Sequence, residues 1–317
     1  MNAAGRSDRP RHADPVPSAP PTRQAAWAWG EARLRQAGLA DADARLEAEV
    51  LLRCAATISR EELLVRPDAP LDAGDAERYA RWIGRRAEGR PTAYLVGRRE
   101  FFGIEFFVDE RVLIPRPETE RLVEVVGEAL RGRTSPLVAD IGTGSGAIAV
   151  ALAHTLPDLR AVATDISVAA LAVARRNAAR AGVLERITWA EGAGVEALAG
   201  VVGEGALDAL VSNPPYIPSA DVADLPVEVR AHEPAVALDG GPDGLRLHRE
   251  VIAGARYLRP GGVLALEVSA LGGQAREVAA LIAAAGYYRA PSVVRDYGET
   301  ERVVLARRRG GDADHRY

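Results

Sequence analysis

The chain has 317 residues and contains no lysine, so all 40 of its basic side chains are arginines. The absence of lysine excludes a lysine Schiff base and a phosphate-binding loop that ends in lysine. The 44 acidic residues leave a formal net charge of −4. A chain with this balance has no broad basic field for holding duplex nucleic acid. We therefore expect no direct binding to duplex nucleic acid.

Cysteine and histidine are also scarce. The single cysteine, Cys54, cannot form a disulfide within the chain, which fits a reducing compartment. The five histidines have neither the His–His nor the Cys–His spacing of a metal site, so no metal is predicted. No apolar run approaches the roughly 20 residues that a membrane-spanning helix requires, and the N-terminus lacks the apolar segment of a secretory signal. We expect a cytoplasmic protein without membrane contact.

The N-terminal third divides into a tail and a helical domain. Residues 1–24 are rich in proline, arginine, serine and alanine and are expected to be disordered, because they cannot bury enough apolar surface to offset chain entropy. Residues 25–90 show helical spacing of apolar residues, and S-R-E-E at 59–62 has the form of a capping box. Leu46, Val50, Leu51 and Cys54 recur at three-to-four spacing, which predicts a helix of a small all-helical domain with Cys54 as a core residue rather than a nucleophile.

The remainder of the chain changes character. Residues 91–115 carry aromatic and β-branched side chains around Gly103, which predicts a β-hairpin linker. Residues 116–308 alternate apolar strands with helices, which predicts an α/β domain with a mostly parallel sheet covered on both faces. We assign 309–317 to a second disordered tail. The expected strands are 137–141, 160–165, 186–190, 207–212, 263–268 and 301–307, and the expected helices are 146–155, 167–181, 244–258 and 272–285.

A glycine-rich loop joins the first strand of this domain to its first helix. Glycines let the backbone approach a ligand, and the helix start supplies unpaired N–H groups. The spacing is G-x-G-x-G, whereas a dinucleotide-binding loop has its third glycine one place later. The loop is the stretch D-I-G-T-G-S-G, and its candidate cofactor-binding residues are Asp140, Gly142, Thr143, Gly144, Ser145 and Gly146.

Asp165 ends the second strand of the domain, in A-V-A-T-D-I-S. A carboxylate at this place can accept hydrogen bonds from both hydroxyls of a ribose. A ribose site without a pyrophosphate site indicates S-adenosylmethionine as cofactor. The alternative is that Asp165 only caps the helix that starts near Ser167.

The fourth strand runs into N-P-P-Y at 213–216, on the same sheet edge as the glycine loop. An amide or aromatic NH₂ group is a poor nucleophile, because its lone pair is delocalised. The Asn213 side-chain oxygen and the Pro214 carbonyl can each accept one N–H of such a group, while Tyr216 packs against it. Pro214 and Pro215 stiffen the backbone and donate no competing N–H. We interpret the motif as a clamp that orients an NH₂ group toward a sulfonium methyl. The alternative is an ordinary proline turn.

Several further stretches carry a resemblance to a known family: G-R-P-T-A-Y-L-V-G at 89–97, I-P-R-P-E-T-E at 114–120, E-P-A-V-A-L-D-G-G-P-D-G-L at 233–245 and L-R-P-G-G-V-L-A-L-E at 258–267. With the two motifs above, the chain resembles the HemK/PrmC family of release factor glutamine methyltransferases over residues 25–308. The resemblance implies a class I S-adenosylmethionine-dependent methyltransferase fold, Rossmann-like with a seven-stranded sheet. It implies methylation of the glutamine side-chain amide in the Gly-Gly-Gln motif of class I peptide chain release factors, which the helical domain 25–90 helps to recognise.

The resemblance also implies roles for particular residues. Gly142 to Gly146 and Asp165 would bind S-adenosylmethionine, and Asn213, Pro214, Pro215 and Tyr216 would hold the glutamine. Asn213, Pro214 and Tyr216 would be the catalytic residues. Phe101 and Arg116 would line the cavity, with Phe101 and Asn213 as further cofactor-binding candidates and Arg116 as a substrate-binding candidate. The chain departs from the family after the third strand: an aspartate that contacts adenine and a following apolar residue are usual, and Ala193 and Gly194 stand there. We keep Gly194 as a cofactor-binding candidate. Glu191 and Glu196 are the candidate substitutes for the aspartate. The alternative is that both are solvated side chains at the surface.

Two other functions fit parts of the sequence. A DNA adenine N6-methyltransferase would share N-P-P-Y, but the last strands of the sheet use most of the residues after Tyr216 and leave no room for a target-recognition domain. The other alternative is a diverged paralogue that methylates another protein or a small amide, or that only binds S-adenosylmethionine. Ala193, which stands where the family usually has aspartate, is the reason to consider it. We predict the release factor glutamine methyltransferase.

Overall fold

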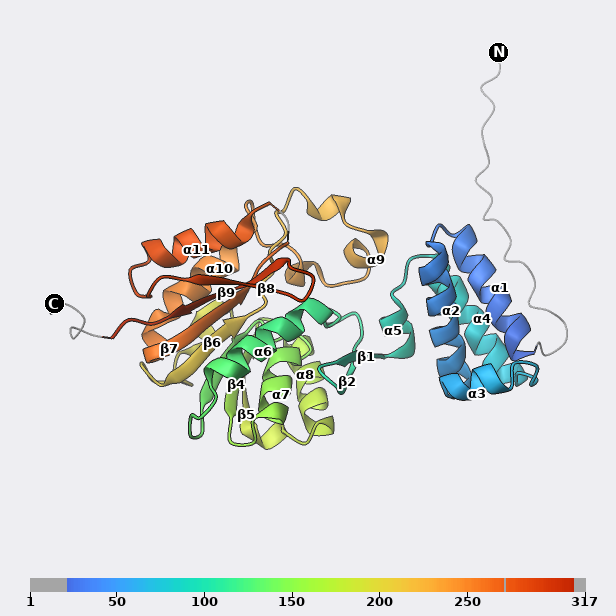
Figure 1. Ribbon diagram of the computed structural model, residues 1–317, viewed down its shortest axis with the longest axis horizontal. Coiled ribbons are helices and arrows are strands. Elements are labelled where there is room, and N and C mark those ends of the chain that lie inside the picture. Colours follow the sequence, from blue (N-terminus) through green and yellow to red (C-terminus); the bar gives the residue numbers. More distant parts are fainter. Residues whose placement is uncertain (1–21, 271, 311–317) are drawn as a thin grey trace, which may run out of the picture. The chain divides into compact units, whose positions relative to one another are not determined.

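The computed structural model describes residues 22–270 and 272–310. The chain forms two compact units, which meet in the sequence between Val96 and Gly97 (Figure 1). The predicted linker 91–115 is therefore divided between them. Its first part forms a short helix, α5 (Thr92–Val96), of the first unit, and its second part forms a hairpin of the second.

The first unit consists of helices around an apolar core of its own. Thr22 Oγ1 accepts a hydrogen bond from Ala25 N at 3.2 Å, so the first helix begins at Arg23. Residues 22–24, which we expected in the tail, are thus the N-cap and first residues of this helix, and residues 1–21 lie outside the described part of the chain. The longer helices are α1 (Arg23–Gln36), α2 (Asp41–Ala56), α3 (Arg60–Val65) and α4 (Ala73–Ala87).

The helix start predicted at 59–62 is confirmed, because Ser59 Oγ accepts from Glu62 N at 3.1 Å at the start of α3. The Glu62 side chain accepts from Arg23 at 2.8 Å, so only the N-cap half of the predicted capping box is present. The helix predicted from the spacing of Leu46, Val50, Leu51 and Cys54 is confirmed as α2. Leu46 is 54% exposed, and Cys54 is half-buried. The buried apolar residues of α2 are Ala44, Ala48, Leu51, Leu52 and Ala55, and Glu49 is buried beside them.

The second unit is a seven-stranded sheet with helices on both faces and a separate hairpin. The hairpin strands are β1 (Arg98–Phe101) and β2 (Ile104–Phe107). The sheet strands are β3 (Leu137–Ile141), β4 (Arg160–Asp165), β5 (Ile187–Glu191), β6 (Leu207–Ser212), β7 (Leu258–Glu267), β8 (Ser292–Arg295) and β9 (Glu301–Arg307). The helices are α6 (Glu120–Ala129), α7 (Ala147–Thr155), α8 (Val168–Arg180), α9 (Val227–Arg230), α10 (Arg246–Ala253) and α11 (Gln274–Ala284).

The strand order is β5-β4-β3-β6-β7-β9-β8, and the first five strands of this order are parallel. β9 pairs antiparallel with both β7 and β8. β6 is buried along its whole length, as expected of a central strand covered on both faces. Helices α6, α7 and α8 cover one face, and α10 and α11 cover the other (Figure 1). The predicted α/β class is confirmed, and the carboxyl ends of β3, β4, β5 and β6 meet at one edge.

The hairpin is fixed to the rest of the second unit by several side chains, of which Asn177 of α8 binds its backbone twice. Asn177 Oδ1 accepts from Phe107 N at 2.8 Å, and its Nδ2 donates to Phe107 O at 3.0 Å. The Arg176 guanidinium lies 3.6 Å from the centre of the Phe107 ring. The hairpin is thus an integral part of the second unit, because its backbone has specific partners there.

The C-terminal end of the described chain is also ordered further than we predicted. Arg309 N donates to Tyr287 O at 2.9 Å, so residue 309 belongs to the paired backbone beside β9 and not to a tail. Residues 311–317 lie outside the described part. Among the described residues, no helix has the length and apolar character needed to cross a membrane.

Candidate functional site

The glycine loop after β3 takes a backbone path that favours glycine. Gly142, Gly144 and Gly146 have φ angles of +73°, +55° and +84°. A Cβ on Gly146 would lie 3.1 Å from the Ala174 Cβ, so this glycine lets α7 pack closely on α8. Gly142 and Gly144 instead face a cavity. The loop therefore places bare backbone next to a ligand site and ends in a helix–helix contact.

The other predicted residues of this loop stabilise its backbone through hydrogen bonds and do not face the cavity. Asp140 is fully buried, and its Oδ2 accepts from Thr143 Oγ1 at 2.7 Å and from Ala149 N at 3.2 Å. Burial raises the pKa of Asp140 to about 7. Ser145 is buried too, and its carbonyl accepts from Asn177 Nδ2 at 2.9 Å. Asp140, Thr143 and Ser145 thus fix the shape of the loop and do not line the cavity.

Asp165 lies at the end of β4 and lines the cavity. Its Oδ2 accepts from Gly144 N at 2.8 Å and its Oδ1 from Ser167 N at 2.9 Å, while Ser167 itself caps α8. Burial raises the pKa of Asp165, and these backbone N–H groups offset the shift in part. Each carboxylate oxygen keeps a second lone pair for a ligand hydroxyl. Asp165 therefore holds the loop to the next strand and presents acceptors to the cavity.

Asn213 follows β6 and lines the same cavity. Its Nδ2 donates to Thr119 Oγ1 at 3.1 Å, which fixes the orientation of the side-chain amide. Within the described chain, no group donates a hydrogen bond to Asn213 Oδ1 or to the Pro214 carbonyl. Two acceptors of the N-P-P-Y motif thus keep their hydrogen-bonding capacity.

The backbone of this motif is held by the glycine-rich stretch that precedes α10. A Cβ on Gly240 would lie 2.5 Å from Pro215 O, and one on Gly244 would lie 2.4 Å from Tyr216 O. Either substitution would collide with rigid backbone, so both glycines are needed for this close approach. Gln274 Nε2 donates to Tyr216 O at 3.1 Å. The motif is therefore fixed by residues far from it in the sequence.

Pro214, Tyr216, Arg116 and Phe101 are not among the residues that line the cavity. Burial raises the pKa of Tyr216, and the nearby Glu267 carboxyl adds to the effect. Arg116 Nη2 donates to Glu233 Oε1 at 2.6 Å, and this ion pair connects the I-P-R-P-E-T-E segment to the segment before α10. Phe101 is 1% exposed and packs edge-on against Phe106, with ring centres 5.9 Å apart. Its predicted place in the cavity is not found, because the hairpin turns this side of β1 inward.

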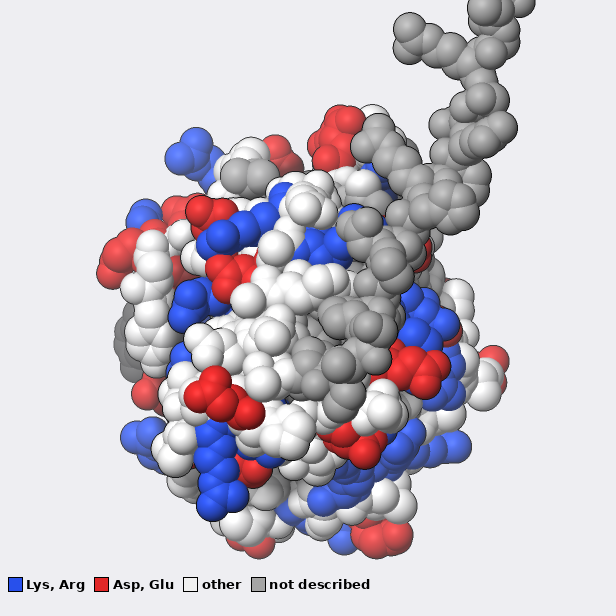
Figure 2. Space-filling model, turned by 90° about the vertical axis from the view of Figure 1, so that its right-hand side faces the viewer, with Lys and Arg blue, Asp and Glu red and all other residues white. Residues whose placement is uncertain are grey.

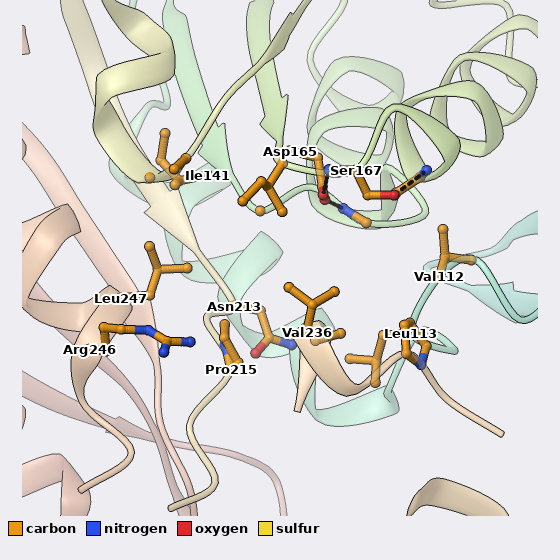
Figure 3. A pocket seen from close by; sticks show the side chains of 18 of the residues that line it. Val112, Leu113, Ile141, Asp165, Ser167, Asn213, Pro215, Val236, Arg246 and Leu247 are labelled. Carbon is orange, nitrogen blue, oxygen red and sulfur yellow. Dashed lines mark hydrogen bonds between the residues drawn. The ribbon is translucent and has the colours of Figure 1, made fainter. Parts of the chain in front are cut away.

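The cavity lies at the carboxyl ends of β3, β4, β5 and β6 and is mostly apolar. Figure 3 shows Asp165 and Ser167 on one side of the open space and Asn213 and Pro215 on the other. Of the predicted site residues, the cavity brings together Gly142, Gly144, Asp165, Gly194, Asn213 and Pro215. It is also lined by residues that were not among the predicted site residues: Arg111, Val112, Leu113, Ile141, Ile166, Ser167, Ala170, Ala193, Pro234, Val236, Ala237, Arg246, Leu247 and Glu250.

The sequence indicates the cavity position of these additional residues to different degrees. Ile166 and Ser167 directly follow Asp165, so their position could have been inferred from it. Glu250 and Leu247 lie on α10, where nothing in the sequence distinguishes the cavity face from the solvent face. The two carboxylates that we considered as substitutes for an aspartate, Glu191 and Glu196, are exposed and do not line the cavity.

The strand order, the glycine loop and the acidic residue after the second strand define a class I methyltransferase fold. The hMettl16 catalytic domain is similar in structure, with a TM-score of 0.52 at 17% identity over 78% of this chain and 85% of that one. Residues 118–229 match the Methyltransferase small domain family, and residues 25–97 match the PrmC N-terminal domain family.

Two relatives are similar over almost their whole length. The release factor glutamine methyltransferase of Moorella thermoacetica is 49% identical over 283 residues, which cover 89% of this chain and 98% of the relative. The release factor glutamine methyltransferase of Gloeobacter violaceus is 43% identical over 286 residues, which cover 89% and 97%. The chain belongs to the family of release factor glutamine methyltransferases.

Proposed function

We propose that this chain transfers a methyl group from S-adenosylmethionine to the side-chain amide nitrogen of the glutamine in the Gly-Gly-Gln motif of class I peptide chain release factors. The observation that carries the proposal is the orientation of Asn213 at the cavity, with Nδ2 bonded to Thr119 and Oδ1 available. The names of the two relatives support the substrate.

The cavity fits the chemical groups of S-adenosylmethionine. Gly142 and Gly144 leave room for a ligand beside the backbone, and Asp165 offers acceptors to the ribose hydroxyls. Ile141, Ile166 and Leu247 provide apolar walls for a flat ring. When bound, S-adenosylmethionine supplies an electrophilic methyl group on a sulfonium. The residues of this chain then have to hold the glutamine amide against it.

The N-P-P-Y motif performs this second task. Asn213 Oδ1 and the Pro214 carbonyl each accept one N–H of the glutamine amide, so the nitrogen lone pair is turned out of conjugation. As the N–C bond to the methyl group forms and the S–C bond breaks, the nitrogen gains positive charge, which both acceptors stabilise. S-adenosylhomocysteine leaves, and the nitrogen loses one proton to water. Orientation and fixed dipoles supply most of the rate gain.

The division of the chain suggests where the protein substrate is recognised. We assign release factor recognition to the helical domain, residues 25–90, and methyl transfer to residues 116–308. The hairpin between them is placed by its contacts in the second unit. A protein that acts on release factors works in the cytoplasm, where translation takes place.

DNA is a weaker candidate substrate. In the first unit, arginines pair with acidic neighbours, as in Arg23–Glu62 at 2.8 Å and Arg81–Glu77 at 2.6 Å. On the face that Figure 2 shows, arginine and acidic side chains are interspersed rather than gathered by sign. After Tyr216, the long elements α10, β7, α11 and β9 all belong to the second unit. The interspersed charges disfavour a basic duplex-binding surface.

The test is transfer of a labelled methyl group from S-adenosylmethionine to a purified class I release factor, beside a variant of that factor with alanine in place of the Gly-Gly-Gln glutamine. We expect label on the first and none on the second. If neither protein is labelled while calorimetry shows S-adenosylhomocysteine binding, the chain is a methyltransferase of another amide. Equal labelling of both would place the modification at a different residue.

A further inference from the structure

Glu250 contributes a carboxylate to the cavity that the proposed function does not yet use. It lies on α10 and lines the cavity together with Leu247. A Cβ on Gly194 would lie 2.3 Å from Glu250 Oε2. The carboxylate therefore occupies the space that any side chain at residue 194 would fill.

This carboxylate has no other evident task. Among residues 22–270 and 272–310, no hydrogen bond or ion pair involves the Glu250 side chain. Its neighbours on α10 are engaged elsewhere, since Arg246 donates to Asp239 O at 3.0 Å and Arg249 pairs with Asp243. Glu250 is the only carboxylate besides Asp165 among the described residues that line the cavity.

The order of the strands indicates which part of the ligand lies next to Glu250. Asn213 follows β6 and marks the reacting methyl group, and Asp165 ends β4 and marks the ribose. Gly194 follows β5, which lies on the far side of β4 from β6. An adenosyl group that passes Asp165 must therefore direct its base toward Gly194 and Glu250.

An adenine base in this place needs an acceptor for its amino group. The wall after β5 supplies none from side chains, because Ala193 and Gly194 stand there. We propose that Glu250 accepts a hydrogen bond from the 6-amino group of adenine and thereby selects the adenosyl cosubstrate. The inference rests on the proposed function, and it assigns to α10 a recognition role that the loop after β5 cannot fill.

The test compares two ligands on the full chain by isothermal titration calorimetry. One ligand is S-adenosylhomocysteine, and the other is its 6-deamino analogue, in which hydrogen replaces the amino group. We expect the wild-type chain to bind S-adenosylhomocysteine at least about tenfold more tightly, which corresponds to about 1.4 kcal/mol. In Glu250→Ala this preference should fall below about threefold, and Glu250→Gln, which keeps one acceptor, should lie between them.

Glu191→Ala and Glu196→Ala are the matched controls, because both residues follow or end β5 but lie outside the cavity wall. Both variants should keep the wild-type preference. The inference is overturned if Glu250→Ala keeps that preference, or if it weakens both ligands by the same factor. A wild-type chain that binds neither ligand would overturn the cosubstrate assignment as well. Binding with the expected preference but without transfer to a release factor would leave this inference standing and reject only the proposed substrate.

Discussion

Asn213 and Asp165 face one cavity from two strands, and they serve different steps of the proposed reaction. Asn213→Ala removes an acceptor for the substrate amide and leaves the cosubstrate side of the cavity unchanged. We expect methyl transfer to fall by at least about 100-fold, as when one donor of an oxyanion hole is removed. The dissociation constant for S-adenosylhomocysteine should change by less than about threefold. Single-turnover transfer and calorimetry on the same preparation measure both quantities.

Asp165→Ala is the matched comparison, because it removes cosubstrate contacts and two hydrogen bonds of the loop. We expect the affinity for S-adenosylhomocysteine to fall by about tenfold or more. Equal affinities for Asp165→Ala and the wild type would exclude the ribose role. Undiminished transfer by Asn213→Ala would exclude the clamp.

Which site residues the sequence could predict depends on how each residue reaches the cavity. Gly142, Gly144 and Asp165 follow strands whose ends are visible in the sequence, and parallel strands bring these ends to one edge. Asn213 was predictable for the same reason. Val112, Leu247 and Glu250 come from a loop and a helix whose orientation depends on distant packing. The glycines at 240 and 244 were noticed as part of a motif, but their close approach to the N-P-P-Y backbone is visible only in three dimensions.

At the scale of elements, Asn177 connects α8, the hairpin and the glycine loop. It is 2% exposed, and its amide bonds the Phe107 N, the Phe107 O and the Ser145 O. In Asn177→Ala, these three backbone groups lose their partner. We expect a loss of unfolding free energy of about 2–4 kcal/mol and weaker binding of S-adenosylhomocysteine, because unsatisfied buried polar groups are costly. Thermal unfolding and calorimetry measure the two effects.

Arg180→Ala is the control, since Arg180 joins the same helix to the same hairpin through an exposed ion pair with Glu105 at 2.7 Å. Surface pairs contribute little, so its loss of stability should stay below about 1 kcal/mol. A similar loss for both variants would show that Asn177 acts as an ordinary surface contact.

The elements themselves were predictable where burial shapes the pattern. Strands β3, β4, β6 and β9 have the predicted bounds, because apolar runs between polar turns mark buried strands. α6 was missed although Leu122, Val123 and Val126 are spaced as in an amphipathic helix. β8 is mostly exposed and has no apolar alternation, so only its pairing with β9 defines it. An edge strand of this kind is specified by its neighbour, which a local pattern does not contain.

At the scale of the whole molecule, each unit has its own apolar core, and most of the buried carboxyls, Glu267 among them, lie in the second. Burial raises the pKa of Glu267, at the end of β7, to about 8, and the nearby Thr119 hydroxyl lowers it only in part. In the unfolded chain this carboxyl would titrate near 4.5. The folded state therefore binds more protons than the unfolded state between these two pH values, so the contribution of Glu267 to stability is greatest below pH 4.5 and is lost as the pH rises to about 8.

Glu267→Gln replaces the protonated carboxyl by a neutral group of similar shape. Its melting temperature should match that of the wild type near pH 5 and exceed it near pH 9, by roughly 5 °C if about 2 kcal/mol is recovered. Carboxyls whose pKa is lowered, such as Asp243 and Asp296, contribute equally to the stability of both proteins. Their contributions therefore cancel in the difference between the two melting temperatures. Glu277→Gln, at an exposed residue of α11, should show no pH-dependent difference. If the difference in melting temperature between Glu267→Gln and the wild type does not change with pH, Glu267 is ionised in the folded protein. The polar side chains around Asn213 then have to stabilise a buried negative charge.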